Sequence, residues 1–276
     1  MPELVLLPAN LESKYTKLKE VIKSYGSIII AYSGGVDSSL LSLAGYDVLP
    51  ESSISVTVSS EFLSGYDLRD AIDTAKKHNF KHRIININVL DNPEVTANTK
   101  LRCRFCKQAV IEEIFKIKNE LGYNYILDGA NLDDSADYRP GQQAAVELGV
   151  KSPFVEAGFT KQDIRNLAKF LSLELWNKPA AACLASRIPY NTVITKDILK
   201  KIRLSEEFIK NLGYQGFRVR HHGEIARIEL VKADISKFIL NHSNLIDTAL
   251  KNIGYSFVTV DLSGYETGSL NKIKDN

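Results

Sequence analysis

SIIIAYSGGVDSS, residues 27–39, joins a short apolar run to a turn that contains two glycines. Residues 27–32 are rich in β-branched side chains, which predicts a strand that is buried on both faces. Gly34 and Gly35 then turn the chain, and the residues that follow, SSLLSLAG, predict a helix. A strand, a glycine turn and a helix in this order are typical of the edge at which an open α/β sheet binds its ligands.

Strands and helices alternate along the first two thirds of the chain. Apolar runs predict further strands at 54–59, 82–87 and 123–127, and helical spacing predicts helices at 66–78 and 104–121. A predicted helix at 11–25 precedes the first strand, and a capping-box pattern at Thr160 and Asp163 opens another. This alternation predicts a doubly wound α/β fold with a mostly parallel sheet.

The pattern changes near residues 188–195. The sequence then predicts a helix at 195–212, a hairpin of 217–221 with 224–230, a helix at 233–251 and a strand at 256–262. We therefore expect two domains. The first covers residues 1–190 and carries the glycine turn and the cysteines. The second, residues 191–276, is a smaller α+β domain expected to serve substrate binding and oligomerisation.

The composition is that of an ordinary globular protein. Of 276 residues, 44% are hydrophobic and 25% are charged. A net charge of +2 is too small to indicate a nucleic-acid surface. No apolar run approaches the roughly 20 residues of a membrane span, and the first residues do not resemble a signal peptide. The odd number of cysteines fits a reducing compartment, so we expect a cytoplasmic protein.

The turn at residues 33–39 carries groups that bind phosphate. Backbone N–H groups of the two glycines and of the following helix N-terminus form a nest for phosphate oxygens, and serine hydroxyls add donors. The Lys-Ser/Thr ending of a Walker A loop is missing. A glycine turn with a Ser/Asp helix cap, and an Asx turn at Asp128, are the structural alternatives. The residues expected to line this phosphate site are Ser33, Gly34, Gly35, Asp37, Ser38 and Ser39. Asp128, which ends a predicted strand at the same edge, is expected to contact the bound ligand or its Mg²⁺.

This turn resembles the SGGxDS pyrophosphate loop of the N-type ATP pyrophosphatases, the family of GMP synthetase and the tRNA thiolases. The resemblance implies that the chain binds the phosphates of ATP and transfers AMP to a substrate oxygen, with Asp37 helping to hold Mg²⁺. Adenylation converts a carboxylate oxygen, which is a poor leaving group, into an acyl-AMP from which a nucleophile expels AMP. The loop would stabilise the pyrophosphate as charge builds on it.

Three cysteines are candidate metal ligands. Cys103 and Cys106 form a C-x-x-C pair ahead of a predicted helix, which also suits a redox couple or half of a zinc site. A redox couple leaves Cys183 unexplained, and a closed zinc site needs a fourth ligand, for which His221 and His222 lie in the other predicted domain. Three thiolates suit a [4Fe–4S] cluster with one open iron. Zinc and unrelated thiols stay open as alternatives.

Longer segments resemble the LarE family. WNKPAAACLASRIPY at 176–190 is similar to that family's WNKxxxxCxxSRxPYG, and FRVRHHGEIARIE at 217–229 to its VRVRxHxxxARIE hairpin. The DG at 128–129 with DYRPG at 137–141 resembles its LDG and NDYRPG segment, and residues 255–268 resemble its RYVTLDLxGFRSG ending. The similarity runs from Ser33 to near the last residues of the sequence.

LarE proteins are ATP-dependent sulfur transferases in the synthesis of the nickel-pincer nucleotide cofactor of lactate racemase. The resemblance implies that a carboxylate of pyridinium-3,5-biscarboxylic acid mononucleotide is adenylated and becomes a thiocarboxylate. In one branch, the cysteine that matches Cys183 gives up its own sulfur and becomes dehydroalanine. The presence of Cys103 and Cys106 resembles the other branch, in which three cysteines hold a [4Fe–4S] cluster and a sulfide on its unique iron is transferred.

Arg218 and Arg220 stand two residues apart on a predicted strand, so their side chains point to one face. Two guanidiniums on one face can clamp a phosphate dianion, as the substrate implied by the LarE resemblance requires. A solvated strand face is the alternative.

Two further charged residues are candidates. Arg187, four residues after Cys183, is expected to contact a substrate carboxylate or, alternatively, to pair with an acid. Glu229 is a candidate metal ligand, because some LarE proteins place the equivalent acid near a metal. A surface salt bridge with Arg227, which shares its strand face, is the alternative.

These observations together predict an ATP-dependent sulfurtransferase. Its cofactors would be ATP, Mg²⁺ and a [4Fe–4S] cluster. Its partner would be a small-molecule nucleotide, with no nucleic acid and no membrane, and we expect a homo-oligomer. The sequence does not identify the sulfide donor. A tRNA thiolase is the second hypothesis, which the near-neutral charge and the absence of a Lys/Arg tract disfavour. A non-catalytic nucleotide sensor that reports redox state through Cys103 and Cys106 is the third.

Overall fold

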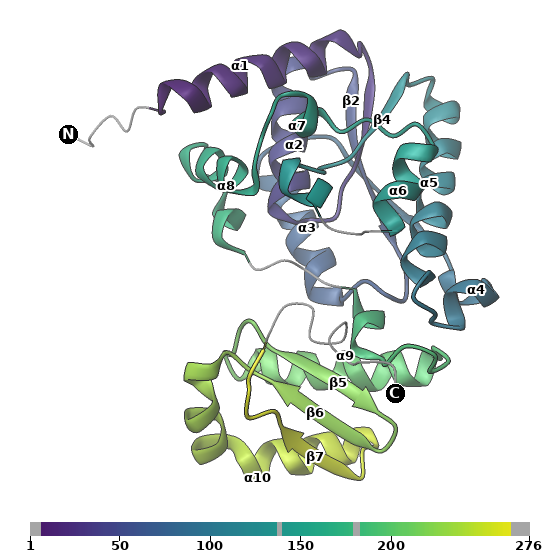
Figure 1. The fold of residues 1–276 in the computed structure, drawn as a ribbon, viewed down its shortest axis with the longest axis vertical. Helices are drawn as coiled ribbons and strands as arrows, with labels where there is room; N and C mark the ends of the chain where they lie inside the picture. Colours follow the sequence, from purple (N-terminus) through teal and green to yellow (C-terminus); the bar gives the residue numbers. More distant parts are fainter. Residues whose placement is uncertain (1–6, 137–139, 179–182, 266–276) are drawn as a thin grey trace. The chain divides into compact units, whose positions relative to one another are not determined.

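The protein is described by a computed structural model that covers residues 7–136, 140–178 and 183–265 (Figure 1). The chain divides into two compact units, and each is discontinuous in sequence. The first unit comprises Met1–Ser60, Gly65–Asn88 and Cys103–Ala181, and the second comprises Glu61–Ser64, Val89–Arg102 and Ala182–Asn276. The sequence analysis expected one boundary, between residues 190 and 191. The division into a catalytic and a substrate domain stays a prediction.

The first unit is built around a parallel sheet of four strands. Its order is β3-β2-β1-β4, and every neighbouring pair is parallel. The strands are β1 (Ile28–Ala31), β2 (Ser53–Ser59), β3 (His82–Asn86) and β4 (Tyr125–Leu127). The predicted α/β class is therefore confirmed. The strand order reverses between β1 and β4, because β2 and β3 extend the sheet on one side of β1 and β4 pairs with its other side.

Helices cover both faces of this sheet. Ile28 and Ile30 of β1 pack into a core with α1 (Ala9–Ser24), α2 (Val36–Val48) and α8 (Lys161–Phe170). Ile29 points to the opposite face, where its core partners come from α5 (Arg102–Leu121) and α6 (Pro140–Glu147). This alternation follows from the period of two in a strand. The unit also contains α3 (Gly65–Lys77), α7 (Pro153–Glu156) and the short helices η2 (Leu132–Ala136) and η3 (Glu174–Asn177).

The second unit contains a mixed sheet of three strands with the order β5-β6-β7. The predicted hairpin is antiparallel, and the last strand joins it in parallel. One face of the sheet packs through Val219, Ala226 and Ile228 against apolar side chains of the long helices. The elements are α9 (Lys196–Asn211), β5 (Arg218–His222), β6 (Ile225–Glu229), α10 (Ile235–Ile253), β7 (Phe257–Val260), α4 (Pro93–Thr96) and the short helices η1 (Val89–Asp91), η4 (Leu184–Arg187) and η5 (Lys232–Asp234).

The segment 89–102 joins the second unit through hydrogen bonds to residues far along the chain. The side-chain nitrogen of Asn98 donates to the carbonyl of Pro189 at 2.8 Å. Arg102, which is 4% exposed, donates to the carbonyl of Ala185 at 3.0 Å. Because these bonds join side chains to backbone carbonyls, no residue pattern marks the acceptors, and the sequence analysis did not foresee them.

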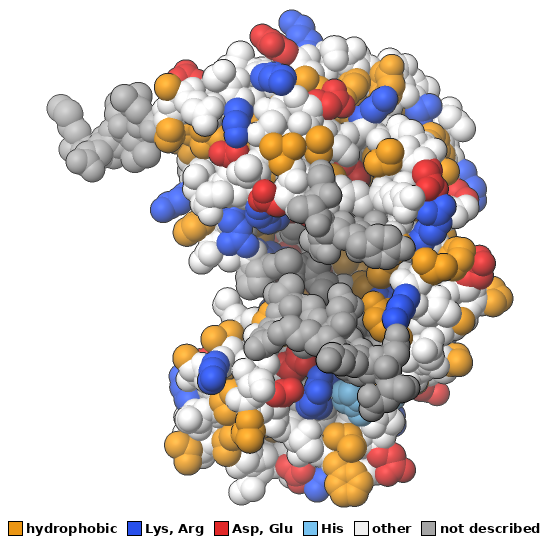
Figure 2. Space-filling model, viewed as in Figure 1, with side chains coloured by type: hydrophobic (Ala, Val, Ile, Leu, Met, Phe, Trp, Pro, Cys, Tyr) orange, Lys and Arg blue, Asp and Glu red, His pale blue; other side chains and the backbone are white. Residues whose placement is uncertain are grey.

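Basic and acidic side chains are interspersed on the face drawn in Figure 2, in keeping with the small net charge of the chain. Among the described residues, no helix is both long enough and apolar enough to cross a membrane.

Candidate functional site

The glycine turn lies at the point where the strand order of the parallel sheet reverses. It connects the end of β1 to α2, whose N-cap is Gly35. Gly34 has a φ of +71°, and a Cβ on it would lie 2.8 Å from the Cβ of Ala71 in α3. Glycine is therefore needed there both for the backbone conformation and for close packing. In open α/β sheets, the crevice at such a reversal is where ligands bind.

The serines of the turn are hydrogen-bonded to one another and to the loop backbone. The Ser38 hydroxyl accepts from the backbone N–H of Ser33 and contacts its hydroxyl, both at 3.2 Å. The backbone N–H of Ser39 donates to the carbonyl of Gly35 at 3.0 Å. These contacts hold the loop in one shape, so that its remaining N–H groups at the helix N-terminus can receive an anion.

The end of β4 lies directly against this loop. A Cβ on Gly129 would lie 2.9 Å from the Cβ of Asp37, so only glycine permits the contact. The Asp128 carboxylate accepts from the backbone N–H of Ala130 at 3.2 Å and from the Ser152 hydroxyl at 2.8 Å. Asp128 thus forms the turn contact that the sequence analysis held as the alternative, and its predicted contact with ATP or Mg²⁺ stays a prediction.

Asp37 is paired with a lysine that the sequence analysis missed. The Lys161 ammonium donates to Oδ1 of Asp37 at 2.6 Å and also to Oδ2. Lys161 is the first residue of α8, where a positive charge opposes the helix dipole. Because a lysine at this position does not stabilise the helix, its presence weakly indicates that the side chain interacts with another group.

Cys103 and Cys106 occupy the first turn of α5 in the first unit. Their spacing of three residues places both side chains on one helix face. Cys103 is exposed and Cys106 is half-buried. Their neighbour Arg104 forms an exposed ion pair with Glu147 at 2.6 Å.

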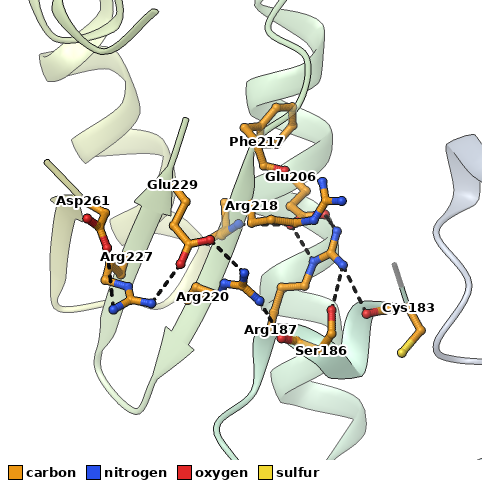
Figure 3. A network of polar contacts seen from close by, with 11 residues as sticks. Cys183, Ser186, Arg187, Glu206, Phe217, Arg218, Arg220, Arg227, Glu229 and Asp261 are labelled. Atoms are coloured by element: carbon orange, nitrogen blue, oxygen red, sulfur yellow. Dashed lines mark hydrogen bonds and ion pairs between the residues drawn. The ribbon is translucent and has the colours of Figure 1, made fainter. Parts of the chain in front are cut away.

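Cys183 belongs to the second unit and is exposed. It precedes η4, and its carbonyl accepts a hydrogen bond from Nη1 of Arg187 at 3.1 Å. Arg187 is 1% exposed and forms two ion-pair contacts with Glu206, each at 2.9 Å (Figure 3). The structure thus forms the acid pairing that the sequence analysis held as the alternative for Arg187. Its predicted contact with a substrate carboxylate stays a prediction.

Four charged residues lie on the face of the small sheet opposite its apolar core. In the hairpin register, Arg218 lies opposite Glu229, and Arg220 lies opposite Arg227. Nη1 of Arg220 donates to the carbonyl of Ser186 at 2.7 Å, which ties β5 to the Cys183 segment (Figure 3). The predicted sharing of a strand face by Arg218 and Arg220 is borne out by this register; phosphate binding stays a prediction.

Glu229 is enclosed by arginines. It is 1% exposed, and it accepts from Nη2 of Arg220 at 2.8 Å and from Nη2 of Arg227 at 2.9 Å. This is the ion pair that the sequence analysis held as the alternative to a metal contact. Within the described ranges, no group of three or more His, Cys, Asp and Glu side chains is gathered in the manner of metal ligands.

Both histidines of the hairpin have a pKa below the ordinary value. Burial lowers the pKa of His222, and the positive charges of Arg227 and Arg220 lower it further. Burial also lowers the pKa of His221, whose Nδ1 lies 3.3 Å from the Tyr255 hydroxyl. Of the segments that resemble the LarE family, residues 137–139, which include Arg139, 179–182 and 266–268 lie outside the described residues.

The parallel sheet and the glycine turn at its reversal point are consistent with a pyrophosphate-loop ATPase, and similarity to a tRNA thiolase places the chain in that class. The chain is 30% identical over 202 residues to the tRNA-specific 2-thiouridylase MnmA of Wolbachia pipientis subsp. Culex pipiens. The match covers 59% of this chain and 54% of that protein. No protein-family model matches the chain.

Similarity over nearly the whole chain then gives the family. The chain is 32% identical over 264 residues to the pyridinium-3,5-bisthiocarboxylic acid mononucleotide synthase of Lactiplantibacillus plantarum, covering 95% of each protein. It is 40% identical over 265 residues to the uncharacterised protein slr1717 of Synechocystis sp., covering 95% of this chain and 98% of that one. The chain belongs to the LarE family, and it is an ATP-dependent sulfurtransferase.

Proposed function

We propose that the chain converts a carboxylate of pyridinium-3,5-biscarboxylic acid mononucleotide into a thiocarboxylate, as a step in nickel-pincer nucleotide synthesis and lactate racemase maturation. The observation that carries this proposal is the attachment of the Cys183 segment to the arginine strand. Arg187 donates to the carbonyl of Cys183, and Arg220 donates to the carbonyl of Ser186. A candidate sulfur-handling residue and candidate phosphate-binding residues are thereby held within one unit.

In the first step, a substrate carboxylate oxygen attacks the α-phosphorus of ATP. The bond between the α-phosphorus and the bridging oxygen breaks, pyrophosphate leaves, and an acyl-AMP forms. The N–H groups of the turn at 33–39 would bind the pyrophosphate as charge builds on it. Asp37, an oxygen ligand in the first turn of α2, would hold Mg²⁺. In the second step, a sulfur nucleophile attacks the acyl carbon and AMP leaves.

Arg218 and Arg220 would hold the phosphate of the nucleotide substrate. Arg218 is oriented by its own contacts, because Nη1 donates to the carbonyl of Phe217 at 2.6 Å and its guanidinium lies 4.9 Å from the centre of the Tyr265 ring. A guanidinium that is already oriented loses less conformational freedom when it binds an anion.

We propose that Cys103, Cys106 and Cys183 hold a [4Fe–4S] cluster. The donor chemistry fits, since the cluster prefers thiolates and two of these thiols share one face at the start of a helix. Arg102, directly before Cys103, is anchored to Ala185, two residues after Cys183. When bound, the cluster would supply an iron able to carry the sulfide that is transferred.

The sacrificial use of Cys183 is the alternative within the same reaction. The Cys183 thiolate would attack the acyl-AMP and expel AMP. Loss of the Cα proton and cleavage of the Cβ–S bond would then leave a thiocarboxylate and dehydroalanine. The exposure of Cys183 suits this role as well.

Anaerobic purification followed by iron and sulfide analysis distinguishes the two mechanisms. The cluster proposal expects about four irons per chain, lost in the Cys103→Ala variant, and repeated turnover with added sulfide. The sacrificial mechanism expects a single turnover and a protein lighter by the mass of hydrogen sulfide. A tightly bound single zinc ion would contradict the cluster. Absence of pyrophosphate release with ATP and the pyridinium nucleotide would contradict the proposed reaction and favour a nucleotide sensor.

A tRNA thiolase is the second candidate, supported by the similarity to 2-thiouridylases. These relatives extend well beyond the matched region, since the match covers about half of their length. Salt-sensitive retention of tRNA would support this candidate. We further propose that the chain acts in the cytoplasm. We also propose that it forms a homo-oligomer, and gel filtration with light scattering would test this.

A further inference from the structure

Arg102 occupies a position that does not suit an arginine. It is the first residue of α5 and directly precedes Cys103. A positive charge at the N-terminus of a helix opposes the helix dipole. Arg102 is also only 4% exposed, and arginine is rarely buried so deeply unless other groups hold its guanidinium. The residue therefore does not stabilise α5, which indicates that its side chain serves a contact outside the helix.

The guanidinium of Arg102 joins the segment before the C-x-x-C pair to the loop after Cys183. Its Nη1 donates to the side-chain oxygen of Asn98 and, at 3.0 Å, to the carbonyl of Ala185. Ala185 lies two residues after Cys183, in the short helix η4. One side chain thus connects two positions that each stand within two residues of a cysteine.

Asn98 is fixed to the same loop by contacts of its own. It is fully buried and has a φ of +53°, a left-handed conformation that asparagine adopts more readily than most residues. Its Nδ2 donates to the carbonyl of Pro189 at 2.8 Å, and its carbonyl accepts from the backbone N–H of Asn191 at 3.0 Å. The Asn98 oxygen that accepts from Arg102 is therefore held in place independently of Arg102.

The loop that carries Ala185 is held in place as well. The guanidinium of Arg220 donates to the carbonyl of Ser186 at 2.7 Å, and the backbone N–H of Leu184 donates to the carbonyl of Phe62 at 2.9 Å. A mobile acceptor would follow the arginine wherever it moved, whereas a fixed acceptor determines where the arginine lies. The two acceptors thus determine where α5 begins.

We propose that Arg102, bound to Asn98 and Ala185, is a positioning residue for the C-x-x-C pair. It fixes the start of α5, so that the two thiols of the pair are held in place for the cluster. This inference rests on the cluster in the proposed function. Ligands that are already held in place lose less conformational freedom when they bind, so the pair retains iron more firmly than it would on a mobile helix end.

The rate of iron release tests this assignment. Full-length protein is reconstituted anaerobically with iron and sulfide, desalted, and exposed to the chelator bathophenanthroline disulfonate, whose iron complex is followed by absorbance. We expect Arg102→Met to release iron about 10- to 100-fold faster, because residues that orient metal ligands typically change metal affinity by such a factor. Arg102→Lys keeps a charged donor and is expected to recover part of the loss. Arg104→Met is the matched control, since this arginine also adjoins Cys103 but forms an exposed ion pair with Glu147.

Amide hydrogen exchange of the metal-free protein separates positioning from a general loss of stability. We expect Arg102→Met to speed exchange in peptides that cover residues 103–112 and to leave peptides that cover the hairpin at 218–229 unchanged. This measurement needs neither the cluster nor activity, so it reports on the start of α5 directly.

The outcomes separate this inference from the proposed function. Release of iron from Arg102→Met at the wild-type rate would overturn the assignment, as would equally fast release from Arg104→Met. Unchanged exchange at the start of α5, or faster exchange throughout the second unit, would also overturn it. If the wild type took up no iron, the cluster proposal would fall and this inference with it. If the wild type and Arg102→Met held iron equally firmly, only the role of Arg102 would fall.

Discussion

Arg187 and Glu206 form a two-pronged ion pair in the interior of the second unit. Nε and Nη2 of Arg187 each lie 2.9 Å from a different carboxylate oxygen, and both side chains are 1% exposed. Glu206 also accepts from the backbone N–H of Val219 at 3.0 Å, and Arg187 donates to the carbonyl of Cys183. The pair therefore links the peptide of the exposed cysteine to strand β5.

Replacing Glu206 by glutamine is expected to destabilise the protein by about 3–5 kcal/mol. The substitution keeps the shape of the side chain but leaves the buried charge of Arg187 uncompensated. Urea unfolding followed by circular dichroism gives the free energy. The double variant Arg187→Met with Glu206→Leu is the control, because removing both charges is expected to cost less than removing one. A Glu206→Gln variant as stable as the wild type would show that the pair is not a structural anchor.

Gly34, in the glycine turn at residues 33–39, and Gly122, which follows α5, provide a matched comparison. Their φ angles are +71° and +70°, but a Cβ on Gly34 would meet Ala71 at 2.8 Å, whereas a Cβ on Gly122 would meet nothing within 4 Å. Both alanine variants carry a left-handed backbone cost of about 1–2 kcal/mol. Gly34→Ala is expected to lose about 1–3 kcal/mol more from overpacking and to bind ATP more weakly. Thermal unfolding and ATP titration check this, and equal effects of the two substitutions would contradict it.

His82 is expected to make stability depend on pH. Burial lowers the pKa of His82 below its ordinary value of 6.5, and its Nε2 lies 2.8 Å from the Thr57 hydroxyl. Below about pH 6.5 the unfolded chain binds a proton that the folded chain resists, so the free energy of unfolding falls as the pH drops toward the folded-state pKa. Above that window the histidine is neutral in both states and the dependence vanishes.

The His82→Gln variant tests this contribution by urea unfolding at a series of pH values. Its stability is expected to fall less steeply with acid than that of the wild type. Some slope remains, because burial also lowers the pKa of His221 and His222. A proton NMR titration that placed the pKa of His82 above 6.5 in the folded protein would contradict the prediction.

The glycine turn at residues 33–39 was predictable from sequence because the residues that form it are close together in the chain. Two glycines, three serines and a flanking apolar strand stand within one short stretch, and the register of strands β1 and β4 then places Gly129 against it. Lys161 was not predictable in the same way. Its contact with Asp37 depends on how α8 packs, and the sequence around it shows only a capping box.

The buried charged residues of the second unit could not be predicted from the sequence either. Glu206 stands among lysines and glutamates in α9, a pattern typical of a solvated helix face, yet it is 1% exposed. The sequence left Arg187 open between a substrate contact and an ion pair, because its partner lies 19 positions away in another element. The alternation along β5 and β6, by contrast, predicted correctly that Arg218 and Arg220 share a face.

Arg218 is expected to recognise the phosphate of the nucleotide substrate and nothing else in it. Arg218→Gln removes a charge that is oriented by the Phe217 carbonyl and the Tyr265 ring. We expect a dissociation constant about 10- to 100-fold higher for pyridinium-3,5-biscarboxylic acid mononucleotide, since a charge-assisted hydrogen bond contributes about 1.5–3 kcal/mol. Affinity for the nucleoside that lacks the phosphate should not change. Arg83→Gln, which removes an exposed arginine paired with Glu120 in the first unit, is the control. If Arg218→Gln weakened both ligands equally, Arg218 would be shaping the site rather than binding the phosphate.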